Sequence, residues 1–285
     1  MSQAAPVPAI AAPGWPWPPL MRASAGCHLL AAGAALWLPG ALPWAIGAIV
    51  LNHALITAAG LTPRSHLLGQ NMTRLPPHAA ARREIAITID DGPDPEVTPQ
   101  VLALLDAHGQ RATFFCIAER VRAHPALARE IVARGHSIQN HSTHHRHNFS
   151  LLGPRGFTAE ISEAQQVLEQ TAGERPSCFR APAGLRNPFL APVLHRMGLT
   201  LVSWTRRGFD TRERDPAVVL GRLTRTLAAG DILLLHDGHA AHAANGRAVL
   251  LEVLPPLLAR LRAEGLRAVT LPEALASSSP SASTS

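Results

Sequence analysis

The sequence predicts an α/β fold: a parallel barrel of strand–helix units, preceded by two apolar helices. Short apolar runs typical of strands alternate with stretches of helical periodicity from residue 84 onward, as they do in parallel sheets. Charged and imidazole side chains stand at the ends of several of these runs. Upstream, residues 23–63 contain no Asp, Glu, Lys or Arg, which predicts helices placed in an apolar environment.

The composition indicates a folded chain with more apolar residues than a soluble core requires. Of its 285 residues, 47% are hydrophobic and 16% are charged, whereas about 25% is typical for the charged share. This excludes wholesale disorder. The net charge of +6 comes from arginines alone, and because these are scattered rather than clustered, no nucleic-acid partner is predicted. The three cysteines Cys27, Cys116 and Cys178 have no metal or redox spacing, so buried free thiols are expected.

The N-terminal part predicts a membrane anchor. Residues 1–22 are rich in Ala, Pro and Trp and predict an irregular tail. The uncharged run that follows gives roughly 60 Å of helix at about 1.5 Å per residue, enough for two crossings of a ~30 Å bilayer core. Because LPGALP interrupts it, we expect a transmembrane helical hairpin within residues 23–63, with helices near 23–38 and 43–61. A single span and a buried soluble segment remain alternatives.

Arginines flank the apolar run on both sides, since Arg22 precedes it and Arg64, Arg74, Arg82 and Arg83 follow. The positive-inside rule therefore favours the cytoplasmic face of a bacterial-type inner membrane for both flanks, with membrane lipid as a partner. A single span would instead place the C-terminal domain on the other side. Residues 64–83 are predicted to be a linker.

The elements of the barrel follow in order. We expect strands at 84–89, 112–117, 136–140, 177–181, 199–204, 231–235 and 266–270, and helices between them, for example at 97–109, 125–135 and 217–230. The serine-rich end, 277–285, is predicted to be a flexible tail. In parallel barrels the chemistry gathers at the carboxyl ends of the strands, so the residues there are the candidates for function.

The first and third predicted strands end in a candidate metal site. Asp90 and Asp91 end the first strand and point in opposite directions, so one carboxylate can bind a cation while the other accepts a proton. His141 and His145 follow the third strand at a spacing that places both imidazoles on one face of a helix. With Asp91 they form a three-ligand set with positions open for water and substrate. The alternative for the aspartates is ordinary turn chemistry.

His144 and His147 lie in the same cluster and are candidates for a supporting role or for none. Arg180 ends the fourth strand, where it can orient a carboxylate, and the bend after it can point a backbone N–H into the site. His236 ends the sixth strand and can protonate a leaving group. The alternatives are a surface arginine beside a turn and a core histidine.

Four motifs, TIDDGPDP, GHSIQNHSTHH, FRAPAG and ILLLHDG, resemble in sequence and order the NodB-homology domain of polysaccharide deacetylases, carbohydrate esterase family four. The resemblance covers residues 84–276. It implies an irregular (β/α)7 barrel that removes N-acetyl or O-acetyl groups from sugars with one divalent metal, usually Zn²⁺.

The resemblance also implies a role for each residue that matches a family motif. Asp90 corresponds to the general base and His236 to the general acid. The other positions are the metal ligands Asp91, His141 and His145, the base-orienting Arg180, the oxyanion-hole N–H of Ala183 and the acetyl-pocket wall Leu234.

The sequence departs from the family pattern in two places. At the end of the fifth strand the family carries an Asp that charges the catalytic histidine and a Trp that shapes the substrate pocket. Here Arg207 and Thr211 take those places, which leaves Asp210 as the substitute for the Asp. Ala183 stands where many members have Tyr, so the substrate cleft is expected to be more open.

The expected function is hydrolysis of a carbon–nitrogen bond, a linear amide, that removes an N-acyl (acetyl) group from an amino sugar of a polysaccharide or glycoconjugate. The alternatives are an O-acetyl esterase, a deformylase or deacetylase of a lipid-linked amino sugar, which a related branch of the family resembles, and a catalytically silent sugar-binding homologue.

Overall fold

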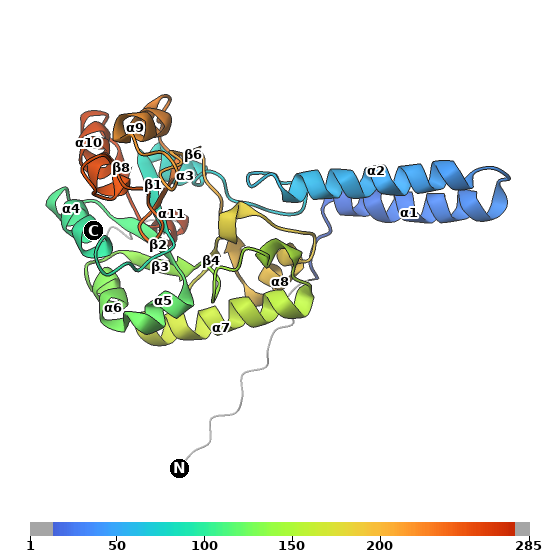
Figure 1. Cartoon of the computed structure of the whole chain (residues 1–285), viewed down its shortest axis with the longest axis horizontal. Coiled ribbons are helices and arrows are strands. Elements are labelled where there is room, and N and C mark those ends of the chain that lie inside the picture. Colours follow the sequence, from blue (N-terminus) through green and yellow to red (C-terminus); the bar gives the residue numbers. More distant parts are fainter. Residues whose placement is uncertain (1–13, 277–285) are drawn as a thin grey trace, which may run out of the picture.

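A computed structural model describes residues 14–276 of the chain. Most of the predicted N-terminal tail and all of the predicted C-terminal tail therefore lie outside the described residues. Within them, a pair of long helices projects from an α/β domain (Figure 1).

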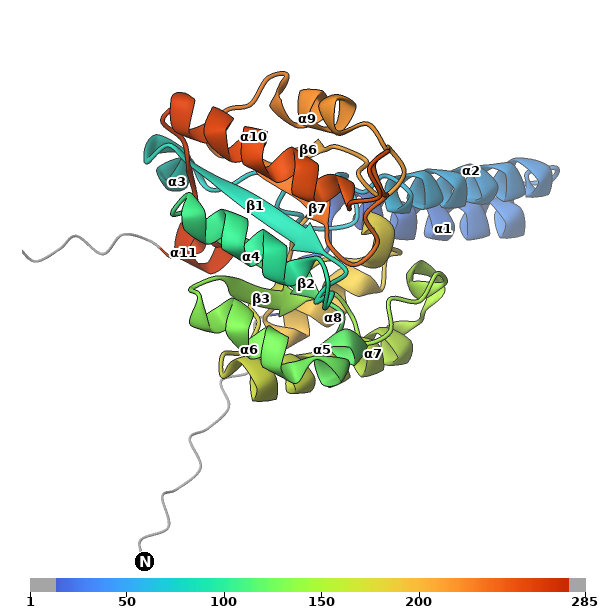
Figure 2. The ribbon, with the colours of Figure 1, turned by 60° about the vertical axis from the view of Figure 1, so that its left-hand side comes forward.

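The projecting helices are α1 (Pro19–Trp37) and α2 (Leu42–Gly60), which pack side by side (Figures 1 and 2). Helix α1 begins at Pro19, so the predicted irregular tail ends before residue 22; proline suits a first helical turn, where its missing N–H costs nothing. Among residues 14–276, only α2 is long and apolar enough to cross a membrane by length and composition. The predicted helices are present, and one of them has the composition of a membrane span.

Residues 64–83 pack closely on the domain. Met72 pairs with Val202 and Arg74 with Asp231, each as an isolated β-bridge, and Leu75 is buried. The short helix α3 (Pro77–Ala81) then leads into the first strand. The end of α2 is thereby held against the sheet over a short and well-packed connection.

The domain is built on one sheet in which all strand pairs are parallel. Its order is β5-β4-β3-β2-β1-β7-β6, and β8 pairs with the start of β1. The strands are β1 (Glu84–Asp90), β2 (Ala112–Cys116), β3 (Ser137–Asn140), β4 (Cys178–Phe179), β5 (Thr200–Leu201), β6 (Arg206–Arg207), β7 (Ile232–His236) and β8 (Arg267–Ala268). The predicted α/β class with parallel strands is confirmed.

Of the predicted irregular (β/α)7 barrel, the structure shows the coarser architecture, a parallel sheet of eight strands that curls into a half-barrel. In the described part of the chain its edge strands β5 and β6 do not pair with each other, and both are two residues long, too short to close the sheet. Residues 72–75 bridge part of this gap through Val202 and Asp231. Sequence patterns missed β6 because its two residues are both arginines rather than an apolar run.

Helices cover the outside of the curled sheet (Figures 1 and 2). They are α4 (Thr98–Ala107), α5 (Ala118–Ala123), α6 (Pro125–Ala133), α7 (Pro154–Ala172), α8 (Leu190–Met197), α9 (Pro216–Thr224) and α10 (Val249–Ala263), with 3-10 turns at Phe149–Leu151 and Pro182–Gly184. Helix α11 (Leu271–Leu275) packs instead in a smaller core with Ala86 of β1. Cys116 and Cys178 are buried free thiols, as expected, whereas Cys27 on α1 is only half-buried.

Strand β1 shows how the core positions the site. Ile85, Ile87 and Ile89 belong to the large core under the helices, while Ala86 belongs to a smaller core inside the curl. The alternation continues with Thr88 and Asp90 on the inner side, since side chains two residues apart share a face of a strand. The strand is buried throughout, which is typical of parallel sheets covered on both faces.

Candidate active site

The carboxyl ends of β1 and β7 place two titratable side chains next to each other. Asp90 and His236 are Cα partners in the pairing of these strands, and both are buried. They line a cavity of about 560 Å³. Most of the predicted site residues also line it: Asp91, His141, His145, Ala183 and Leu234.

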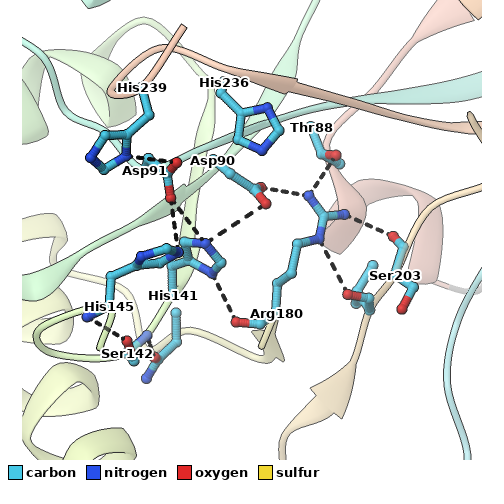
Figure 3. Close-up of polar contacts among 12 residues, drawn as sticks. Thr88, Asp90, Asp91, His141, Ser142, His145, Arg180, Ser203, His236 and His239 are labelled. Carbon is cyan, nitrogen blue, oxygen red and sulfur yellow. Dashed lines mark hydrogen bonds and ion pairs between the residues drawn. The ribbon is translucent and has the colours of Figure 1, made fainter. Parts of the chain in front are cut away.

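Asp91, His141 and His145 converge on one point of this cavity (Figure 3). Oδ1 of Asp91 lies 3.2 Å from Nε2 of His141 and 3.2 Å from Nε2 of His145. One candidate ligand atom from each residue lies within 4.8 Å of the other two. His141 donates a hydrogen bond from Nδ1 to the carbonyl of Arg180 (2.8 Å), which leaves Nε2 with its lone pair toward Asp91.

These residues fit a divalent metal. Oδ1 of Asp91 is buried and has no hydrogen-bond partner among the described residues, although two imidazole nitrogens stand beside it. Such an orphaned oxygen is costly unless a cation satisfies it. One carboxylate oxygen and two imidazole nitrogens are also the donor types that a catalytic zinc site uses, with positions left for water and substrate.

The electrostatics of the cluster favour a positive charge. Burial alone would raise the pKa of Asp91, but the adjacent imidazole of His141 and the hydrogen bond from His239 outweigh burial and lower it. Burial lowers the pKa of His145 to about 4, so this imidazole is neutral and free to act as a ligand at neutral pH. His141 is also deeply buried, yet Asp90 and Asp91 raise its pKa, as they would attract any cation placed here.

The loop that carries the histidines corrects one expectation. His141 and His145 were expected on one face of a helix, but residues 141–148 form an irregular turn. Ser142 and His145 have positive φ angles of 67° and 52°, and the backbone N–H of His145 donates to Oγ of Ser142 (3.1 Å). The turn, rather than helical periodicity, brings the two rings to 4.8 Å between centroids.

Arg180 is fully buried beneath Asp90 and orients it. Nη1 of Arg180 donates to Oδ1 of Asp90 (2.6 Å) and to Oγ1 of Thr88 (2.8 Å) (Figure 3). The guanidinium also donates to the carbonyls of Val202 and Ser203 and stacks on Phe115, 4.1 Å from its centroid. Because Arg180 bonds Oδ1 of Asp90, Oδ2 is left turned toward His141, 3.8 Å from Nε2.

Asp210 lies behind His236. Its Oδ1 accepts a hydrogen bond from Nδ1 of His236 (2.9 Å), and its Oδ2 accepts from the backbone N–H of the same residue (2.7 Å). Burial lowers the pKa of His236, but the charge of Asp210 and this hydrogen bond outweigh burial and raise it. The arrangement therefore favours the protonated form of the imidazole beside Asp90.

The wall of the cavity is formed by Leu234, Trp204 and the turn at Ala183. Leu234 is buried on β7, two residues before His236, and so shares its face of the strand. Ala183 has a φ of 53°, a left-handed conformation that is uncommon outside glycine, within the 3-10 turn Pro182–Gly184. A small apolar group can be enclosed here.

Three further histidines border the cluster. His144 and His147 both line the cavity, and Nδ1 of His144 contacts Oε1 of Glu160 (3.0 Å). His239 was missed in the sequence, yet its Nδ1 donates to Oδ2 of Asp91 (2.9 Å). The only signal for it was its place three residues after His236 in the loop that leaves β7.

Comparisons with known proteins agree with this geometry. Residues 78–202 match the family model described as polysaccharide deacetylase. A peptidoglycan-N-acetylglucosamine deacetylase from Bacillus cereus is 34% identical over 193 residues, which cover 67% of this chain and 87% of that protein. This chain belongs to the polysaccharide deacetylase family.

Two other members of the polysaccharide deacetylase family are similar to this chain, one in sequence and one in structure. A chitooligosaccharide deacetylase from Azorhizobium caulinodans is 33% identical over 195 residues, covering 66% of this chain and 92% of that protein. The crystal structure of a family-four carbohydrate esterase pseudoenzyme from Bacillus anthracis superposes with a TM-score of 0.64 at 22% identity, covering 72% of this chain and 69% of that one. At this identity the superposition shows the fold.

In this member of the polysaccharide deacetylase family, the residues that depart from the family pattern lie in or next to the cavity. Asp210 is buried and bonded to His236 as described above, while Arg207 and Thr211 line the cavity. Arg207 carries no carboxylate and so takes no part in holding the imidazole.

Proposed function

We propose that this chain is a membrane-anchored, metal-dependent hydrolase that removes an N-acyl group, in the simplest case acetyl, from an amino sugar of a polysaccharide or glycoconjugate. The observation that supports this most is the convergence of Asp91, His141 and His145 beside Asp90 and His236 in one cavity. The names of the family relatives, deacetylases of peptidoglycan and chitooligosaccharide, agree with it.

In this proposal Asp91, His141 and His145 hold one divalent metal, with Zn²⁺ the first candidate. A metal in this position supplies Lewis-acid chemistry, polarising the acyl carbonyl and lowering the pKa of water. Asp90, held by Arg180, accepts the proton of the attacking water. The backbone N–H of Ala183 donates to the developing oxyanion.

His236 completes the reaction in this proposal. It donates its proton to the sugar nitrogen, because an unprotonated amide nitrogen is a very poor leaving group. The carbon–nitrogen bond then breaks, and acetate and a free amine are the products. Leu234 and Trp204 enclose the methyl of the acyl group.

Zinc content and acetate release test this proposal directly. The purified full chain is expected to hold one zinc per molecule and to release acetate from an N-acetylglucosamine oligomer. Loss of supporting residues around a metal already weakens binding by about 10- to 100-fold, so His141→Ala should weaken zinc binding by about 100-fold or more. The matched control is His242→Ala, an exposed histidine outside the cavity.

The alternatives give different results in the same assay. Release from an O-acetyl ester but not from the N-acetyl oligomer identifies an esterase. Zinc without release from either substrate, together with binding of the oligomer, identifies a silent sugar-binding homologue. A chain without zinc contradicts the proposal itself.

A lipid-linked amino sugar is the second candidate substrate, and the position of α2 favours it. The backbone N–H of Arg186 donates to the carbonyl of Gly60 at the end of α2 (3.2 Å), and Oγ of Ser203 donates to the carbonyl of Pro63 (2.7 Å). Gly184, which lines the cavity, has no room for a Cβ because Pro63 and Trp204 lie against it. The base of the helical pair therefore touches the rim of the cavity.

The surface of the helical pair supports its insertion into a bilayer. Each helix has 19 residues, about 28 Å at 1.5 Å per residue, close to the ~30 Å hydrocarbon thickness. Large apolar side chains point outward, for example Leu30, Leu36 and Val50. The polar groups pair inward, because Nδ2 of Asn52 donates to Oγ of Ser24 (2.9 Å) between the helices.

The ends of the pair also suit two membrane interfaces. Trp15 and Trp17 lie near the start of α1, and Trp37 and Trp44 flank the turn at the far end, as in the aromatic belts of membrane proteins. Arg22 and Arg64 stand at the domain end. We therefore place the domain on the cytoplasmic face of a bacterial-type inner membrane.

Charge in the middle of α2 is expected to impair this anchoring. Leu51 stands halfway along α2 and is 62% exposed, and an arginine at the centre of a membrane helix costs about 2.5–3.5 kcal/mol. We expect Leu51→Arg to lower the fraction of chain that stays in the membrane after an alkaline carbonate wash. Leu151→Arg, at an exposed leucine of the domain, is the matched control. Complete extraction of the unaltered chain by the wash would contradict the anchor.

A further inference from the structure

Arg207 lies in the active-site cavity, and no carboxylate in the described part of the chain forms an ion pair with it. It belongs to β6, where it pairs with Leu234 of β7, and it lines the cavity. Among residues 14–276 its side chain makes no hydrogen bond or ion pair, and its Nε is buried and unpartnered. A buried N–H that lacks an acceptor is uncommon in folded proteins and calls for an explanation.

The neighbouring carboxylates are already engaged. Asp210 accepts two hydrogen bonds from His236, and Asp90 accepts from Arg180. Glu213, on the same loop, pairs with Arg222 at 3.1 Å. No carboxylate within residues 14–276 forms a salt bridge with Arg207, so its positive charge is available to a bound group.

Aromatic rings fix the guanidinium in place. Its central carbon lies 5.3 Å from the ring centroid of Trp204 and 5.0 Å from that of Phe209. Stacking of this kind orients the planar guanidinium and leaves its N–H edge available for a planar or tetrahedral anion. Burial lowers the pKa of Arg207, but arginine remains charged at neutral pH.

From these contacts we infer that Arg207 binds an anionic group of the substrate, a carboxylate or a phosphate, and so selects acidic N-acyl amino sugars over neutral ones. This inference rests on the proposed function and narrows its substrate class. Leu234, the partner of Arg207, precedes His236 by two residues, roughly 7 Å along a strand. The anionic group therefore belongs to the acylated sugar or to its neighbour.

Binding of matched sugars tests the inference without requiring turnover. The probes are N-acetylglucosamine, which is neutral, N-acetylmuramic acid, which carries a carboxylate, and N-acetylglucosamine 1-phosphate. Each is titrated calorimetrically into the zinc-loaded full chain in detergent. Charge-assisted hydrogen bonds of one arginine correspond to about 10- to 100-fold in affinity, so at least one acidic sugar should bind this much more tightly than the neutral one.

Variants assign that preference to one side chain. Arg207→Gln should abolish the preference, Arg207→Lys should retain part of it, and the exposed control Arg214→Gln should leave it unchanged. Thermal unfolding and zinc content confirm that each variant is folded. Comparing the carboxylate with the phosphate distinguishes the two anions, and adding a phosphate-linked lipid in vesicles tests a membrane source.

Two results would overturn the inference. The first is an unaltered chain with no preference for either acidic sugar; the second is an Arg207→Gln variant that keeps the preference, which would place the anion on the metal. Acetate release measured in parallel separates the two proposals. A preference that Arg207→Gln removes, in a chain that hydrolyses none of the sugars, would support the anion site and contradict the hydrolase.

Discussion

An Asp90→Asn variant is expected to release acetate from an N-acetylated amino sugar about 10²–10⁴-fold more slowly than the unaltered chain, the range that positioned proton transfer contributes. Asparagine keeps the size of the side chain and can still accept a hydrogen bond from Arg180, but it cannot accept a proton from water. The loss should appear mainly in kcat, measured as initial rates of acetate release under substrate saturation.

The zinc content of Asp90→Asn should stay near that of the unaltered chain, because Asp90 is not one of the three converging ligands. Removing its charge leaves Arg180 buried without a counter-ion, so a lower thermal unfolding temperature is also expected. Asp106→Asn, at a half-exposed surface ion pair, is the control for rate and stability. Full activity in a folded Asp90→Asn variant would show that another group takes the proton.

The sequence predicted most of this site because its residues stand at strand ends. Asp90 and His236 stand at the ends of apolar runs and His141 follows the short strand β3, and the ends of parallel strands meet at one edge of a sheet. What could not be predicted depends on backbone angles and on loops. Ser142 and His145 have positive φ angles, so the segment forms a turn instead of the expected helix. The spacing of residues in a sequence does not predict such angles.

The long strands of the fold could be predicted from the sequence, but one of the shortest could not. Long apolar strands such as β1 and β7 were found, whereas β6 was missed. Two-residue strands have too few side chains for a pattern, and pairing with distant segments determines them. The contact of His239 with Asp91 was unpredictable for the same reason, because it joins residues that are 148 positions apart in the sequence.

Substitution of His236 should also reduce hydrolysis of an N-acyl sugar, by about 10²–10⁴-fold in His236→Ala. The loss is expected to be smaller on an O-acetyl ester, because an alcohol leaves more readily than an unprotonated amine. Asp210, Asp90 and Asp91 are the charged groups that raise the pKa of His236, and Asp210 has the largest effect. Equal losses on the amide and the ester would contradict a role in protonating nitrogen.

The pH profile distinguishes protonation by His236 from a structural role. The protonated imidazole is the active form, so kcat should fall as the pH rises through the pKa of His236. Asp210→Asn removes the strongest group that raises this pKa, and the alkaline limb of the profile should move to lower pH while zinc content stays unchanged. Asp215→Asn, at the exposed start of α9, is the control and should leave the limb in place. A limb that does not move in Asp210→Asn would mean that the imidazole is held protonated by other groups or that its proton is not used.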